Sequence, residues 1–192
     1  MPPDVATSGP GVTEPGSDVT VALDDDGKSL DVFERLVADR PAQGGLVLRL
    51  PAVTTLSGEL GQTRIEVLDL QVEVDGRVVA TRGTDGGYLA DVPAAAGPLR
   101  ATLRYRLAGA LVRVTPSLPG RIFALVTPLA AENSVQARRP VLVRVSDRRV
   151  LGVTCPAGTG AAQLCGTRAG STWQAALPAG AAPVTLLQLS LR

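Results

Sequence analysis

Short apolar runs separated by turn-forming residues are the feature of this sequence that most limits its fold. From residue 18 onward such a run recurs about every 8–15 positions, with glycine or proline between most of the runs. The chain has 192 residues, of which 21 are glycine and 15 are proline, and this content disfavours long helices. We therefore predict an all-β fold, an antiparallel β-sandwich of the immunoglobulin-like or a related type, with little helix.

The apolar runs define the candidate strands. They are Val19–Leu23, Leu46–Leu50, Leu68–Val74, Arg77–Thr81, Tyr88–Val92, Leu99–Leu107, Leu111–Val114, Ile122–Thr127, Val141–Val145, Val150–Thr154, Trp173–Leu177 and Val184–Leu191. Asp75-Gly76 stands between two alternating runs and predicts a tight hairpin turn. The pair Val67-Leu68 interrupts a period of two and predicts a β-bulge.

Two further segments are candidate helices. Ser29–Asp39 places four apolar side chains on one helical face behind a candidate N-cap, so the local pattern favours a helix. As a strand, this segment would mix apolar and charged residues on both faces. Leu129–Arg139 lacks glycine and proline and is expected to form one helical turn or a loop.

The domain organisation follows from composition. Residues 1–17 are rich in proline, glycine and polar residues and are predicted to be a flexible tail or linker. Residues 18–192 are predicted to form the β-sandwich domain, with a candidate subdivision near residues 115–120. The N-terminus does not resemble a signal peptide, and no apolar run has the length of a membrane span. The chain is therefore expected to be cytosolic or the soluble part of an exported protein whose targeting segments are absent.

The two cysteines favour the exported alternative. Cys155 and Cys165 flank a short segment containing glycine and proline, which is flexible enough to meet disulfide geometry. Two unrelated core residues are the alternative, whereas a zinc site lacks the remaining ligands. We predict a Cys155–Cys165 disulfide, no metal, and an oxidising, extracytoplasmic compartment.

Charge is distributed unevenly along a chain whose net charge is only +1. Residues 1–99 carry 7 basic and 16 acidic side chains, and residues 100–192 carry 12 basic and 2 acidic ones. The two halves either neutralise each other or leave a basic face for an anionic partner. The candidate face for an anionic partner consists of Arg100, Arg104 and Arg106, which alternate along one strand. The small net charge argues against nucleic acid as a partner.

The absence of histidine removes several kinds of chemistry. A histidine general base, imidazole metal ligands and the serine–histidine–aspartate triad are all excluded. The Asp24–Asp26 run resembles part of a calcium loop, but position 12 of that loop would be Arg35 instead of glutamate. A solvated turn or a looser calcium site remain as interpretations of that run. No cofactor and no catalytic residue are predicted.

Several segments resemble, in order, the extracytoplasmic β-rich domain of predicted bacterial membrane proteins of unknown function. The matching segments are Val19–Leu23 with Asp26-Gly27, Leu30–Glu34, Leu103–Ala110, and Val153–Gly158 with Cys165. The resemblance implies that Leu30–Glu34 is a strand, against the local helical pattern. It supplies no catalytic residues.

These observations predict a non-catalytic extracytoplasmic interaction or structural module of a bacterial envelope or membrane-anchored protein. The arginine-rich composition, with one lysine, is typical of a high-GC bacterium. The expected partner is another envelope protein or an anionic membrane surface, and the oligomeric state stays open. The alternative is a carbohydrate-binding or glycoside hydrolase domain that uses carboxylates such as Asp69, Glu73 or Glu132.

Overall fold

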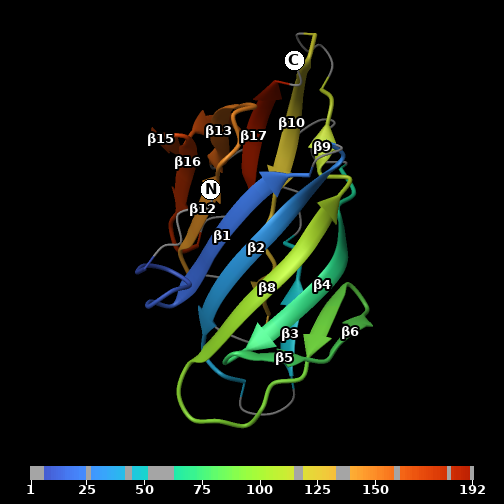
Figure 1. Ribbon diagram of the computed structural model, residues 1–192, viewed down its shortest axis with the longest axis vertical. Helices are drawn as coiled ribbons and strands as arrows, with labels where there is room; N and C mark the ends of the chain where they lie inside the picture. Colours follow the sequence, from blue (N-terminus) through green and yellow to red (C-terminus); the bar gives the residue numbers. More distant parts are fainter. Residues whose placement is uncertain are drawn as a thin grey trace.

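The computed structural model describes residues 7–24, 27–41, 45–51, 63–114, 119–132, 139–157, 161–180 and 183–190. Every regular element in these ranges is a β-strand, so the predicted all-β fold is confirmed. The strands form three sheets (Figure 1). None of the described residues belongs to a helix long and apolar enough to cross a membrane.

The largest sheet has eight strands in the order β15-β16-β12-β1-β2-β8-β4-β5. The bounds of these strands are β1 (Gly16–Leu23), β2 (Ser29–Ala38), β4 (Glu66–Val74), β5 (Arg77–Val79), β8 (Leu99–Ala108), β12 (Val141–Val145), β15 (Gly166–Ala169) and β16 (Thr172–Leu177). Neighbouring strands are antiparallel except β1 and β12, which are parallel. In Figure 1 the long strands β1, β2, β8 and β4 run side by side diagonally across the molecule.

Two smaller sheets complete the fold. The five-stranded sheet, in spatial order, contains β14 (Ala161–Leu164), β13 (Val150–Ala157), β17 (Thr185–Ser190), β10 (Arg121–Val126) and β9 (Leu111–Val112). The four-stranded sheet contains β11 (Ala130–Ala131), β3 (Leu46–Arg49), β7 (Gly87–Ala90) and β6 (Thr81–Thr84). In Figure 1, β10 and β17 lie toward the upper end of the molecule and β3 and β6 toward the lower end.

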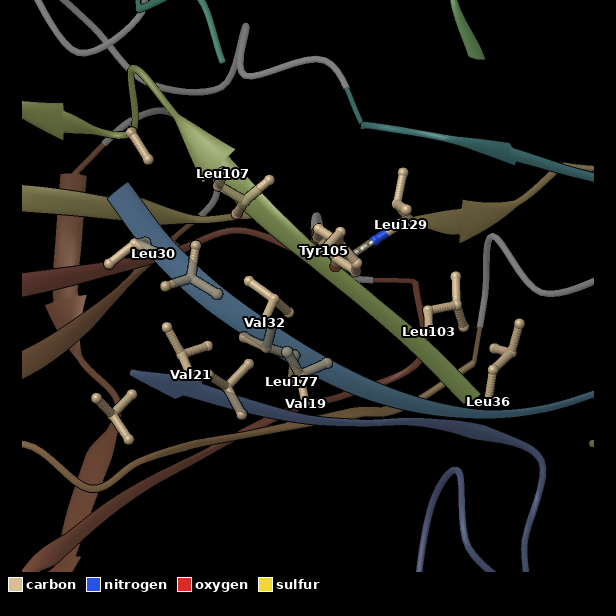
Figure 2. Packing of buried hydrophobic residues seen from close by; sticks show 14 of the residues in the cluster. Val19, Val21, Leu30, Val32, Leu36, Leu103, Tyr105, Leu107, Leu129 and Leu177 are labelled. Carbon is tan, nitrogen blue, oxygen red and sulfur yellow. Dashed lines mark hydrogen bonds between the residues drawn. The ribbon is translucent and has the colours of Figure 1, made fainter. Parts of the chain in front are cut away.

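One apolar core is shared by the three sheets. Its fully buried members include Val19, Leu30 and Leu103 from the eight-stranded sheet, Ala124 and Leu187 from the five-stranded sheet, and Leu46 and Leu48 from the four-stranded sheet. Figure 2 shows the inward side chains of β1, β2 and β8 converging on this core. The core includes residues on both sides of the candidate subdivision at 115–120, of which 115–118 lie outside the described residues.

The helix predicted for Ser29–Asp39 is wrong, because Ser29–Ala38 forms β2 in the middle of the large sheet. Its neighbours β1 and β8 pair with it along almost its whole length, so tertiary pairing overrides the local helical pattern. Both faces of β2 do mix apolar and charged residues, which is the pattern that argued against a strand. Phe33 and Val37 do alternate outward with charged residues, while Glu34 points inward and is buried.

The first strand begins two residues before the predicted domain boundary at residue 18. β1 begins at Gly16, and residues 7–15 belong to the described structure. Gly11 lies so close to the sheet that a Cβ atom there would be 2.2 Å from the Arg35 carbonyl oxygen. Its φ of +73° is also a conformation that favours glycine. This part of the expected tail is therefore fitted against β1 and β2.

Two local backbone predictions are confirmed. Asp75 and Gly76 have φ values of 49° and 80°, as a tight hairpin between β4 and β5 requires. The pairing of β4 with β8 shifts between Leu68 and Gln71, which is a β-bulge beside the predicted position. Asp25 and Asp26, on which the looser calcium site would depend, lie outside the described residues, as do 133–138 of the Leu129–Arg139 segment.

The predicted disulfide joins Cys155 of β13 to Cys165, with a Cα–Cα distance of 5.7 Å. Cys165 lies between β14 and β15, which are edge strands of two different sheets. Its amide also donates to the Val153 carbonyl at 3.1 Å. The disulfide therefore fixes the corner where the chain leaves the five-stranded sheet for the eight-stranded one.

The eight-stranded and five-stranded sheets are in close contact at Gly166, so adding a methyl group there is expected to destabilise the protein. A Cβ atom there would lie 2.5 Å from Val153 Cβ and 3.3 Å from Trp173 Cε3. We expect Gly166→Ala to reduce the free energy of unfolding by about 1–3 kcal/mol, because the neighbours are packed side chains. Gly83→Ala is the matched strand control, since its Cβ would meet open space. Urea unfolding of both variants tests this, and equal stabilities would contradict it.

Candidate functional site

The predicted basic face lies on β8, where Arg100, Arg104 and Arg106 are all exposed. The acidic strand β4 is the direct neighbour of β8, and Arg106 forms an ion pair with Asp69. Glu73 pairs in register with Thr102, so it too lies beside the arginine row. The acidic and basic strands therefore pair with each other within one sheet.

The other two arginines also contact the chain itself. The Arg104 guanidinium lies over the Phe33 ring, 5.2 Å from its centroid. Arg100 Nη1 donates to the Val12 carbonyl oxygen at 2.6 Å, which ties the N-terminal segment to the outer face of the sheet. Each guanidinium thus has an internal partner, and the row is less available to an anionic surface than the sequence suggested.

A second ionic cluster was not anticipated from the sequence. Asp18 is 1% exposed, and its carboxylate is shared by Arg35 of β2 and Arg144 of β12, each at 2.5 Å. The three residues lie on the strands β12, β1 and β2, which are neighbours. Two guanidinium groups on one buried carboxylate leave local positive charge, but the cluster is closed by its own hydrogen bonds.

A buried glutamate forms a polar centre inside the core. Glu34 is 0% exposed, and its Oε2 accepts hydrogen bonds from the Tyr105 hydroxyl at 2.9 Å and the Leu129 amide at 3.1 Å. The Tyr105 hydroxyl and Leu129 amide are also 3.2 Å apart, and Figure 2 shows these two residues meeting in the core. Glu34 Oε1 is buried without a partner of good hydrogen-bond geometry among the described residues.

Burial raises the pKa of Glu34 from 4.5 to about 7. Loss of water around the carboxylate disfavours its charged form. The hydroxyls of Ser17 and Tyr105 and the Leu129 amide lower the pKa, but desolvation is the larger effect. The side chain therefore changes charge near neutral pH although solvent does not reach it.

A pocket of about 350 Å³ lies where the three sheets meet. Residues at the starts of β1 and β12, at the end of β3, around β11 and before β17 line it. The apolar lining includes Leu50, Pro51, Leu129, Ala131, Pro140 and Pro183. The polar lining consists of Ser17, Arg49, Glu132 and Arg139. This size and mostly apolar lining are typical of a binding pocket.

One donor in the pocket lining has no acceptor in the described part of the chain. Arg139 forms an ion pair with Asp39 through Nη2, while its Nη1 is buried without a partner. Arg49 and Glu132, which also line the pocket, pair at 2.8 Å and are about half exposed. A buried N–H without an acceptor costs free energy, so the hydrogen-bonding capacity of this lining residue, Arg139, is not fully used within the described part of the chain.

The carboxylates named as catalytic candidates do not converge. Glu132 lines the pocket, whereas Asp69 lines a shallow hollow on the outer face of β2, β4 and β8. The two carboxylates that are almost fully buried, Asp18 and Glu34, point to opposite faces of the large sheet. No group of three metal-ligating side chains occurs among the described residues.

Sequence reasoning missed both Glu34 and the pocket. Glu34 stands in the inward series Leu30, Val32, Glu34 and Leu36, and in a strand this alternation places Glu34 on the buried face. The pocket is made by residues far apart in the chain, and no local pattern indicates it.

No protein-family model and no curated protein matches the chain. Among solved structures, it is similar to an aminopeptidase N family protein from Idiomarina loihiensis, with a TM-score of 0.54 and 13% identity. The similarity covers 90% of this chain and 29% of that one. Other similar structures are aminopeptidase A from Legionella pneumophila (TM-score 0.47, 9% identity, 90% and 21% covered) and leukotriene A4 hydrolase from Saccharomyces cerevisiae (TM-score 0.46, 8% identity, 89% and 28% covered).

The first of these similarities shows a shared fold and no more, since the identity is low. The chain spans less than a third of the length of each of these proteins. A similar β architecture therefore occurs as one part of the larger aminopeptidase N family protein.

The raised pKa of Glu34 predicts how stability depends on pH. The Glu34 carboxyl titrates near pH 4.5 in the unfolded chain and near pH 7 in the folded protein. Its contribution to the free energy of unfolding therefore falls as the pH rises through this interval. We expect the free energy of unfolding of Glu34→Gln, relative to that of the wild type, to rise by up to about 3 kcal/mol between pH 4.5 and pH 8. The exposed Glu66→Gln is the control. Denaturant unfolding across this pH range measures the difference, and a constant difference would contradict the prediction.

Proposed function

We propose that the chain is a non-catalytic interaction module of a bacterial envelope or membrane-anchored protein, and that the pocket at the junction of the three sheets binds its partner. The observation that carries this proposal is the mostly apolar pocket itself, whose lining includes Arg139, a side chain with a buried Nη1 that has no partner in the described part of the chain. Such a site suits a segment that inserts an apolar side chain and presents an oxygen atom to the guanidinium.

The disulfide supports an extracytoplasmic location. Disulfides persist in oxidising compartments, and this one joins the only two cysteines of the chain. The sequence resemblance to predicted bacterial membrane proteins agrees with this location. We therefore propose that the partner is another envelope protein. An anionic membrane surface is the less favoured partner, because Arg100, Arg104 and Arg106 already have contacts within the chain.

The sequence also supports a non-catalytic role. The chain has no histidine, so neither a histidine base nor a zinc site with imidazole ligands can form. Glu34 is enclosed in the core and is not part of the pocket lining. The shared fold therefore does not imply that this chain has the peptidase activity given in the names of the similar structures.

Photocrosslinking in cells, followed by direct binding, tests the proposal. We expect a photoreactive residue at Ala130, in the pocket wall, to capture an envelope protein that the same residue at Thr84 does not capture. The purified partner is then titrated against the wild type, Arg139→Lys and the control Arg82→Lys. Arg139→Lys keeps a charge for Asp39 but removes Nη1, and we expect about tenfold weaker binding. Equal affinity for all three proteins would contradict the proposal.

Carbohydrate binding is the second candidate, favoured by the hollow on the outer face of the sheet. This hollow, of about 450 Å³, is lined by two carboxylates, Asp31 and Asp69, and by the aromatic ring of Phe33. Arg104 covers that ring and Arg106 holds Asp69, so both groups are already engaged. If the hollow binds sugars, Asp31→Asn will abolish retention on immobilised cell-wall polysaccharide, while Glu66→Asn will not. Absence of retention by the wild type would remove this candidate.

A further inference from the structure

β14 differs from the other edge strands of the described sheets. The edge strands β15, β5 and β6 contain Arg168, Arg77 and Arg82, whereas Ala161–Leu164 contains no charged residue. Charged side chains on an edge oppose pairing with a further strand. Among the described edges with three or more residues, β14 is therefore the one without this protection.

The outer side of β14 presents unpaired hydrogen-bonding groups. The Cys165 amide donates to Val153 on β13, and Thr154 lies opposite Leu164. In an antiparallel ladder the bonded residues alternate, so the N–H and C=O groups of Ala162 and Leu164 point away from β13. Both side chains are exposed as well, and Leu164 is 80% exposed.

The disulfide holds this edge in place. Cys165 directly follows Leu164 and is bonded to Cys155 on the neighbouring strand. An edge that is already fixed loses little conformational freedom when another strand pairs with it. The exposed strand therefore has the rigidity that a docking edge needs.

We propose that two copies of this chain associate through antiparallel pairing of their β14 strands about a twofold axis at Gln163. In this register the Gln163 side chains of the two copies face each other. Each Leu164 lies opposite Ala162 of the second copy, so that a large side chain meets a small one. Ala162 and Leu164 would exchange backbone hydrogen bonds, and the two five-stranded sheets would become one continuous sheet.

The charge pattern explains why a second copy is the occupant. Around a twofold axis the same edge faces itself, so an arginine near the axis would lie close to its own copy. Pairing of β15, β5 or β6 with itself would incur this repulsion, and pairing of β14 does not. No residue of β14 lines the pocket, so the association and the proposed partner binding can fail independently.

Sedimentation velocity of the full chain over a range of concentrations tests the association. We expect a reversible dimer for the wild type and for Thr167→Lys, a control on the exposed edge strand β15. We expect at least about tenfold weaker association for Gln163→Lys, which places two like charges together at the axis. A wild type that is monomeric at its highest soluble concentration, or a dimer unaffected by Gln163→Lys, would overturn the proposal.

An exchange of side chains tests the register. Leu164→Ala removes the large partner and is expected to weaken the dimer. The double variant Ala162→Leu/Leu164→Ala restores a large residue opposite a small one and is expected to restore association. Circular dichroism and thermal unfolding establish that each variant is folded. Equal association of Leu164→Ala and the double variant would overturn the register.

Discussion

Three sheets that share one apolar core must also satisfy whatever polar groups they enclose. Glu34 is such a group, and its hydrogen bonds join β2, β8 through Tyr105, and the segment between β10 and β11 through Leu129. The cluster therefore links the eight-stranded sheet to the connection between the two smaller sheets. A buried carboxylate is costly, and its raised pKa reflects that cost. The benefit is a fixed position for Leu129, which lines the pocket.

The sequence predicted most strands because their residues alternate between core and solvent. β8 is the clearest example, since its inward residues are all buried and its outward arginines are exposed. β2 was mispredicted because its inward row contains Glu34 and its outward row contains Phe33 and Val37. These exceptions have tertiary causes. The Tyr105 hydroxyl donates to Glu34 Oε2, and Arg104 covers Phe33, and neither partner lies near β2 in the chain.

The disulfide could be predicted from the sequence because the chain has only two cysteines and the segment between them is short. Whether the arginines of the basic face are paired could not be predicted from the sequence, because this depends on which strand lies beside β8. With β4 beside β8, Asp69 reaches Arg106 and the face is partly neutralised. The pocket is harder still to predict, because its lining comes from five regions of the chain. Its unpaired Arg139 donor becomes visible only when burial and partners are known.

Pairing through the disulfide-fixed β14 edge would place two copies of the pocket in one assembly. The proposed twofold dimer through β14 would carry two pockets at a fixed separation, since the pairing strands are anchored to each core. A partner with two binding segments, or a partner that is itself dimeric, would then engage both pockets. In the proposed dimer the second contact would be intramolecular, so modest affinity at each pocket would become strong attachment to such a partner. Gln163→Lys would leave each pocket intact and remove this gain, whereas Arg139→Lys would weaken both contacts and leave the dimer intact.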